Sequence, residues 1–527
     1  MWLQIVLFVL VTFLIYKLLF SSKKDYWKKY GIREIDTSHV VSTLDVFIRG
    51  KNLALADKYA YDVMGGDKFC GTREMGIPRL ILKDLDLIKK IMIKDFDYFT
   101  DRRNFFDDPN SALKKMLPSL EGDEWKGVRS AVSPTFTTGK IRRMMEIFNS
   151  VGEEWIAELK KRAKAKGGSI EIDVAEVVNG FTVEVIGSSV FGMKTGTIQN
   201  PNSVFAEMAA KIVAMGKWKV VKFTLSLVFP GLFKIFRIPL MDMGAMNFFQ
   251  GILEQGLKER LSGRMKGDKN DFLQLLVEAK KGELKTAGND ELSEFEKDAQ
   301  LKTGAGEEFD KKQYLTDEVM IAQSLVFFFA GFGTTSNLIV LTMYSLAVHQ
   351  DVQDKLRREV GTIVKKNGSL DYDDLGKLVY MDMVLNEVLR MFPAAARLER
   401  KCVKDYKDPV TGFFAPKGSF VCIPIEAIHS DKRYFANADK FDPEHFSQEN
   451  KAGRNPYAFL PFGTGPRNCI GMRFALVESK AAIAYLVHNF RMEPTEKTPI
   501  PMQTKHAVLQ VLPPDDLGLK LIPLNIK

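Results

Sequence analysis

The stretch of sequence that decides the fold is Phe462-Gly-Thr-Gly-Pro-Arg-Asn-Cys-Ile-Gly471. Its three glycines allow a tight loop whose backbone N–H groups can point at one sulfur atom. An amphipathic segment, GMRFALVESKAAIAYLVHNF, follows Cys469 and predicts a helix that begins there. A helix N-terminus and the nearby Arg467 both favour a thiolate. We therefore expect Cys469 to be a metal ligand or a nucleophile. The six histidines are scattered, so the sequence offers no neighbouring base for a cysteine hydrolase.

Composition and charge exclude several other classes of protein. The chain has 527 residues, of which 46% are hydrophobic and 27% charged, so a disordered, collagen-like or disulfide-scaffold protein is excluded. Its four cysteines have no CxxC or zinc-type spacing. The net charge of +9 comes from mixed charges spread along the chain, which indicates a solvated surface or a face on anionic lipid and not a nucleic-acid partner.

The N-terminus predicts a membrane anchor. Residues 2–20 read WLQIVLFVLVTFLIYKLLF, which as a helix is roughly 28 Å long and matches a hydrocarbon core of about 30 Å. The lysines that follow place the rest of the chain in the cytosol. A removed signal peptide is the alternative, but the basic start and small residues it needs are missing. We expect an anchor at 1–22, a linker at 23–45 and a catalytic domain at 46–527.

The middle of the chain reads mainly as helix, with a charged surface excursion at about 278–312. The longest helix signal has Thr316 as its cap and runs to about His349. At its centre, residues 330–335 read AGFGTT. Two interpretations stay open for this centre: close helix packing with back-bonded threonines, or a local opening where a ligand meets the backbone. In the helical region 373–391, Glu387 and Arg390 share a face, and their apolar neighbours indicate a partly buried pair.

These motifs together resemble those of the cytochrome P-450 superfamily. Phe462–Gly471 fits the FxxGxRxCxG haem loop, residues 330–335 fit AGx(D/E)TT, and Glu387 with Arg390 fits ExxR. The likeness covers essentially everything after about residue 25. Its finer detail is similar to the animal microsomal group that includes families three, six and nine.

The resemblance implies a mainly α fold with small β-sheets, behind an N-terminal transmembrane helix. It also implies haem b with Cys469 as the thiolate ligand of iron. Thr334 would help to deliver protons, and Glu387, Arg390 and His445 would form a structural cluster. The other residues expected at the haem are Arg102, Trp125, Arg129, Arg397, Phe462, Gly463, Arg467 and Gly471.

Three departures from the family pattern stand out. Gly333 occupies the usual acidic position beside the threonine, so the proton relay lacks a carboxylate. His445 stands where the family usually has Arg. The proline-rich hinge that usually follows the anchor is missing from residues 23–43.

The resemblance predicts a haem-thiolate monooxygenase in the endoplasmic reticulum membrane. It would take electrons from NADPH through a reductase, with cytochrome b as a second possible partner, and insert one oxygen atom of O2 into a lipophilic small molecule such as a xenobiotic, steroid or fatty-acid-like compound. The apolar stretch at 223–246 would dip into the bilayer. Two alternatives stay open: a haem-thiolate isomerase or dehydratase that needs no reductase, and a haem-binding protein with little turnover.

Overall fold

The structure describes the chain from residue 26 onward, with internal gaps. The computed structural model describes residues 26–524, apart from 42–44, 46–51, 75, 104–111, 214–218, 220–221, 224, 227–229, 265–270, 285–310, 365–367 and 508–509. The predicted anchor at 1–22 and most of the predicted charged excursion lie outside these residues.

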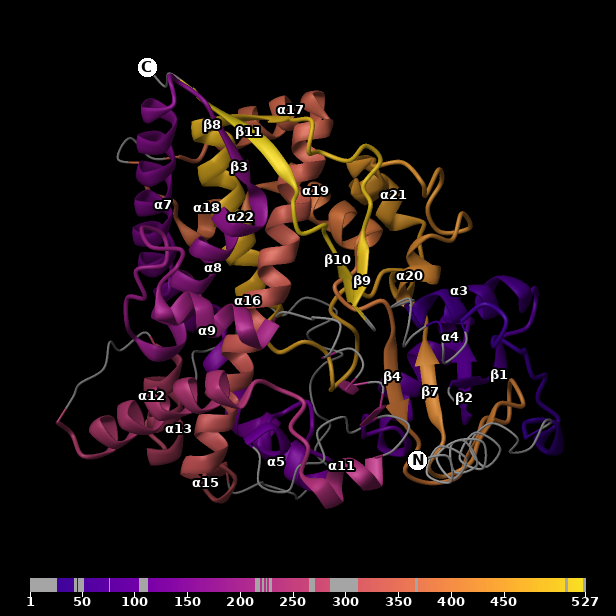
Figure 1. The fold of residues 1–527 in the computed structure, drawn as a ribbon. Helices are drawn as coiled ribbons and strands as arrows, with labels where there is room; N and C mark the ends of the chain where they lie inside the picture. The colour runs from indigo at the N-terminus through magenta and orange to yellow at the C-terminus, as the bar shows by residue number, and fades with distance from the viewer. Residues whose placement is uncertain are drawn as a thin grey trace, which may run out of the picture.

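Helices make up one side of the molecule and a small sheet lies on the other (Figure 1). The α-helices are α3 (Ala54–Val63), α4 (Leu85–Lys89), α5 (Gly122–Val132), α6 (Thr138–Arg143), α7 (Met145–Ala165), α8 (Val174–Phe191), α9 (Val204–Val213), α11 (Pro230–Phe236), α12 (Met243–Leu261), α13 (Phe272–Lys281), α15 (Lys311–Tyr314), α16 (Asp317–Val348), α17 (Gln350–Gly361), α18 (Tyr372–Gly376), α19 (Val379–Met391), α20 (Ile425–His429), α21 (Gln448–Ala452) and α22 (Met472–Asn489). Short 3-10 and π turns lie at η1 (Lys28–Tyr30), η2 (Lys90–Lys94), η3 (Phe96–Tyr98), η4 (Ala112–Lys115), η5 (Ser133–Phe136), η6 (Pro443–Phe446) and η7 (Pro456–Ala458). The expected mainly α fold is confirmed.

The strands form four small sheets in the described chain. Their orders are β1-β2-β7-β4, β3-β11-β8, β10-β9 and β5-β6. In the first sheet β2 runs parallel to β7, while β1 and β4 pair antiparallel with their neighbours. The strands are β1 (Phe69–Glu74), β2 (Ile77–Leu82), β3 (Ile170–Asp173), β4 (Leu398–Lys401), β5 (Tyr406–Lys407), β6 (Phe414–Ala415), β7 (Phe420–Ile423), β8 (Phe490–Pro494), β9 (Lys505–Ala507), β10 (Gln510–Leu512) and β11 (Gly518–Pro523).

The core helix α16 begins and ends close to the predicted positions. The Thr316 hydroxyl accepts the Val319 N–H at 3.2 Å and caps the first turn. The helix continues for 32 residues, with apolar side chains buried on most of its faces. Helices α8 and α16 are long and apolar enough to cross a membrane, but 72% and 56% of their most apolar windows are buried inside the protein, as in core helices.

The AGFGTT segment of α16 is regular helix, so the interpretation as a local opening is wrong. A Cβ atom on Gly331 would come within 2.6 Å of Ile186 Cδ1, so glycine lets α8 pack closely at this point. The Thr334 hydroxyl donates to the Ala330 carbonyl oxygen at 2.6 Å. Close packing with a back-bonded threonine is the arrangement that the structure has.

The described part of the predicted linker packs on the first sheet. Trp27 is fully buried, and its Nε1–H donates to the Thr72 carbonyl oxygen at 3.1 Å. Glu34 pairs with Gly71 as a parallel bridge, and Gly71 leaves room for the Trp27 ring that a Cβ atom would fill. This part of the predicted linker is therefore packed against the first sheet.

Candidate functional site

The loop before α22 is closed by its own backbone. The Cys469 N–H donates to the Phe462 carbonyl oxygen at 2.9 Å, and the Asn468 N–H donates to the Gly465 carbonyl oxygen at 3.0 Å. Gly463 and Gly465 both have φ of +73°, a conformation that glycine adopts without strain. A Cβ atom on Gly465 would also overlap the Met92 carbonyl oxygen. The predicted tight loop is therefore present.

Cys469 lies three residues before the first residue of α22, and the pKa of its thiol is raised, not lowered as the sequence predicted. Its side chain is accessible, unlike those of the other three cysteines, but protein surrounds it closely, and this burial raises the pKa. The Gly471 N–H and the charges of Arg129 and Arg102 act in the opposite direction. In the protein alone, burial outweighs the helix end and the arginines.

Three predicted arginines converge on this loop from different elements. Arg102 donates through Nη2 to the Arg467 carbonyl oxygen at 2.7 Å. Arg129 on α5 donates to Asn468, at 3.1 Å to its carbonyl oxygen and at 2.8 Å to Oδ1. The Arg467 guanidinium lies 4.1 Å from the centre of the Trp125 ring and donates to the Leu120 carbonyl oxygen at 2.7 Å.

The charges of these arginines lack close anionic partners. Burial lowers the pKa of Arg129 to about 10 and that of Arg467 to about 8, and it also lowers the pKa of Arg102. Among the described residues, Asp101 approaches Arg467 only to 3.8 Å. Arg467 Nε and Nη1 and Arg102 Nε are buried without a hydrogen-bond acceptor in the described chain. Such donors fit an anionic group that bonds to several guanidinium groups at once.

Arg400 on β4 is a fourth member of this cluster that the sequence analysis missed. Its side chain is 1% exposed, its Nη1 donates to the Glu399 carbonyl oxygen at 2.9 Å, and its buried Nε has no acceptor in the described residues. Burial, followed by the charges of Arg102 and Arg467, lowers its pKa well below the usual range. The signal available in the sequence was the string Arg397-Leu-Glu-Arg400, which carries two arginines.

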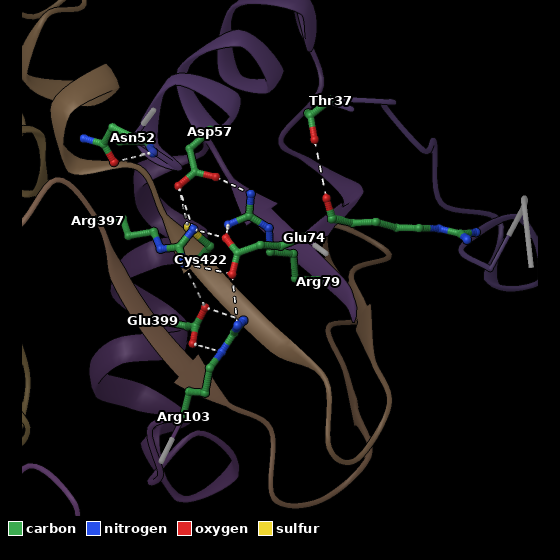
Figure 2. A network of polar contacts seen from close by, with 11 residues as sticks. Thr37, Asn52, Asp57, Glu74, Arg79, Arg103, Arg397, Glu399 and Cys422 are labelled. Carbon is green, nitrogen blue, oxygen red and sulfur yellow. Dashed lines mark hydrogen bonds and ion pairs between the residues drawn. The ribbon is translucent and has the colours of Figure 1, made fainter. Parts of the chain in front are cut away.

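The structure does not support the predicted role of Arg397 at the haem. Figure 2 shows Arg397 pointing into a buried network with Asp57, Glu74 and Arg79. Its guanidinium bonds to Asp57 at 3.2 Å and to both oxygens of Glu74, one of them at 3.1 Å. These carboxylates raise its pKa well above the usual range against the effect of burial. Its charge is already compensated, whereas that of Arg400 is not.

The predicted structural cluster is assembled and buried. Arg390 Nε and Nη2 each donate to Glu387 at 2.8 Å, and the two side chains are 1% and 0% exposed. His445 Nδ1 lies 3.1 Å from Glu387 Oε1, which also accepts the Asp442 N–H at 2.9 Å. Arg390 then donates to the His429 carbonyl oxygen at 3.0 Å, so the cluster joins α19 to α20 and η6.

Comparison with known proteins gives the family. The model of the family "Cytochrome P450" matches residues 65–521. The chain belongs to the cytochrome P450 family. It is 34% identical over 473 residues to cytochrome P450 3A29 of Sus scrofa, which covers 87% of each chain. Cytochrome P450 9e2 of Blattella germanica is 34% identical over 91% of this chain and 90% of its own, and the probable cytochrome P450 9f2 of Drosophila melanogaster is 33% identical over the whole of both.

This cytochrome P450 is therefore a haem-thiolate monooxygenase, an oxidoreductase whose haem iron carries a cysteine thiolate. Relatives from families three and nine confirm the predicted microsomal group. The residues of the site fit haem. The two propionate carboxylates of haem match the buried cluster of guanidinium groups that lack acceptors, and an accessible cysteine lies beside this cluster.

Proposed function

We propose that Cys469 supplies the thiolate of this P450. The observation that carries the proposal is the contrast among the four cysteines. Cys70, Cys402 and Cys422 are buried, and burial raises the pKa of Cys70 to about 12 and that of Cys402 to about 11. Of the four cysteines, Cys469 alone is accessible, in the loop that its own N–H closes on Phe462, with two arginines acting on its charge.

We assign the haem propionates to Arg102, Trp125, Arg129, Arg400 and Arg467. When bound, haem supplies oxygen activation and the transfer of one oxygen atom to substrate. The four guanidinium groups would neutralise the two carboxylates, and Arg102, Arg400 and Arg467 would regain hydrogen bonds that their buried donors lack in the described chain. The Trp125 ring would hold Arg467 in place through its face.

Thr334 is the residue we propose for proton delivery. Its hydroxyl hydrogen is donated to the Ala330 carbonyl oxygen. The lone pairs of the hydroxyl oxygen can therefore accept a hydrogen bond from a proton donor in the site. The preceding Gly333 has no side chain and cannot act as an acid. The chain therefore brings a neutral hydroxyl where the family usually also has a carboxylate.

We propose a single-pass anchor at 1–22 in the endoplasmic reticulum membrane, with the domain in the cytosol. The length and apolarity of residues 2–20 and the lysines after them support this topology. A second membrane contact would lie at 223–246, where Ile235 and Phe236 on α11 are 74% and 67% exposed. Deleting residues 1–22 should leave residual binding to liposomes. A truncated protein that stays in solution with no liposome binding would contradict the second contact.

We propose a lipophilic small molecule as substrate and an NADPH-dependent reductase as electron donor, with cytochrome b as a second candidate partner. Membership of the cytochrome P450 family supports this proposal. Next to the AGFGTT segment, Phe328 on α16 packs with Phe191 and Phe249 at centroid distances of 5.2 and 4.6 Å, and all three rings are buried in the core.

Isotope incorporation tests the proposed reaction. The full-length protein would be placed in vesicles with a reductase, NADPH and 18O2, and a set of lipophilic compounds would be screened. We expect one labelled oxygen atom in the product and no product without the reductase. Rearranged peroxide without reductase would support the isomerase or dehydratase alternative. Haem binding with neither product would support a haem-binding protein with little turnover.

A further inference from the structure

The two strands of chain that carry Arg102 and Arg400 are bonded to each other. Asp101 and Lys401 form an antiparallel bridge, in which the Lys401 N–H donates to the Asp101 carbonyl oxygen at 2.8 Å. Arg102 follows Asp101 and Arg400 precedes Lys401. The bridge therefore brings two guanidinium groups of like charge into one buried cluster.

The residues beside these two arginines, Arg103 and Glu399, point to the opposite side of the paired segments. They carry opposite charges, whereas Arg102 and Arg400 carry like charges. Arg103 Nε and Nη2 donate to the two oxygens of Glu399 at 2.9 and 3.0 Å. Figure 2 shows these two side chains facing each other at the edge of the buried network. Alternation of side chains along extended backbone explains the division, since Arg102 and Arg400 turn toward the loop of Cys469 while Arg103 and Glu399 turn away.

Further contacts fix Arg103 in this position. Its Nη1 donates to Glu74 Oε1 at 2.9 Å, and its guanidinium lies 4.3 Å from the centre of the Phe420 ring on β7. The side chains of Arg103 and Glu399 are 7% and 11% exposed, so water screens the bridge only weakly. A bidentate arginine–carboxylate pair also fixes orientation, because both groups are planar.

We infer that the Arg103–Glu399 bridge is a clamp that positions Arg102 and Arg400 for the haem carboxylates. The like charges of Arg102 and Arg400 repel each other, and among the described residues neither guanidinium forms an ion pair with a carboxylate. The attraction between their neighbours in sequence, on the other side of the same two strands, holds both backbones in register. Arg103 and Glu399 are thus positioning residues that need not touch haem. This inference rests on the proposed propionate contacts of Arg102 and Arg400.

Haem release from the full-length holoprotein tests the clamp. The variants are Arg103→Gln, Glu399→Gln and the double variant, with apomyoglobin in excess as the haem acceptor. Each single change leaves the remaining groups paired. In Glu399→Gln, Arg103 keeps Glu74, and in Arg103→Gln, Glu399 keeps Arg397 at 3.9 Å while Glu74 keeps Arg79. We expect each single variant to release haem roughly 10-fold faster than the wild type, as for residues that orient a cofactor ligand. The double variant should release haem at the rate of the singles, since the same bridge is lost once.

The midpoint potential of the haem gives a second readout that fold stability alone does not move. Looser guanidinium groups place less positive charge near the haem, so the potential of each variant should become more negative. The matched control is Arg260→Gln, which breaks another buried ion pair, with Asp271 at 3.0 Å, between α12 and the start of α13. That variant should lose thermal stability while its haem release and potential stay at the wild-type values.

Two results would overturn the clamp. One is wild-type haem release and potential in both single variants, and the other is a double variant whose acceleration is the product of the two singles. Arg102→Gln and Arg400→Gln test the propionate site directly, so that its failure can be distinguished from failure of the clamp. If these two release haem faster while the clamp variants do not, the clamp is wrong and the propionate site stands. If they too release haem at the wild-type rate, the propionate site itself is wrong.

Discussion

Cys469 donates its backbone N–H to the carbonyl oxygen of Phe462 across a distance of 2.9 Å. This bond closes the loop between Phe462 and Cys469 through backbone atoms, and the side chains of Arg102 and Arg129 add hydrogen bonds to carbonyl oxygens of the same loop. The conformations of Gly463 and Gly465 are what permit the return. The position of the cysteine therefore depends in part on two glycines that have no side chain.

Gly465→Ala should be among the most destabilising single changes in this loop. The new Cβ would meet the Met92 carbonyl oxygen in a backbone conformation with φ of +73°, and we expect a loss of about 3 kcal/mol in unfolding free energy and poor haem content. Gly453→Ala is the control, because its φ is −89° and open space surrounds its Cβ position. Equal denaturant midpoints for the two variants would contradict this account.

Arg397→Gln and Arg400→Gln should have opposite effects. Loss of Arg397 leaves Asp57 and Glu74 buried with fewer partners and should cost about 3–5 kcal/mol of stability. Loss of Arg400 removes an uncompensated buried charge, so the haem-free protein should be no less stable while haem release becomes roughly 10-fold faster. Thermal unfolding and transfer of haem to apomyoglobin measure the two effects. Faster haem release in Arg397→Gln than in Arg400→Gln would mean that Arg397, and not Arg400, contacts the haem propionates.

The sequence carried enough information for the fold, the cysteine loop and the buried Glu387–Arg390 pair. Motif spacing reports on such features because one loop or one helix turn contains all of their residues. Arg397 and Arg400 show where this stops. Both belong to one short string, and only the carboxylates from α3 and β1, more than 300 residues earlier, decide which of them is neutralised.

The centre of α16 and the cysteine pKa could not be predicted for a related reason. Two glycines in a helix are compatible with a break in the helix or with close packing of a neighbouring helix. At Gly331 the reason is close packing, because Ile186 on α8 occupies the space that a Cβ atom would need. The Gly471 N–H near the start of α22 lowers the pKa of the Cys469 thiol, as expected for a helix end. Burial by the surrounding protein raises this pKa by more. Both outcomes depend on tertiary packing.

His445 and His429 should give stability a pH dependence of opposite sign. The hydrogen bond to Glu387 raises the pKa of His445 from 6.5. Its contribution is therefore complete below pH 6.5 and is lost as the pH rises through the folded-state pKa. Burial lowers the pKa of His429 to about 3, so its contribution is complete above pH 6.5 and is lost as the pH falls toward 3.

Denaturant unfolding of wild type, His445→Gln and His429→Gln between pH 4 and 8.5 measures both effects. His445→Gln should remove part of the decline above pH 6.5, and His429→Gln part of the decline below it. The charged neighbours Glu387, Arg390 and Arg454 stay unchanged in both variants. Parallel stability curves for all three proteins would show that neither histidine is linked to folding in this way.

The missing acid at Gly333 should lower the fraction of NADPH that ends in oxygenated product. A general acid typically contributes ~10²–10⁴-fold in rate, and Gly333 supplies none. Gly333→Glu should raise the coupled fraction and Thr334→Ala should lower it, with product and NADPH measured together in preparations of equal haem content. A flat or lower fraction in Gly333→Glu would mean that another residue or the substrate already supplies the proton route.

The most direct test of the account is the spectrum of the reduced carbon monoxide complex in four cysteine-to-serine variants. The thiolate-specific red-shifted band should be lost in Cys469→Ser alone and kept in the variants of Cys70, Cys402 and Cys422, which are buried away from the loop. A red-shifted band that persists in Cys469→Ser would contradict the assignment of this cysteine, and with it the haem site built around the loop.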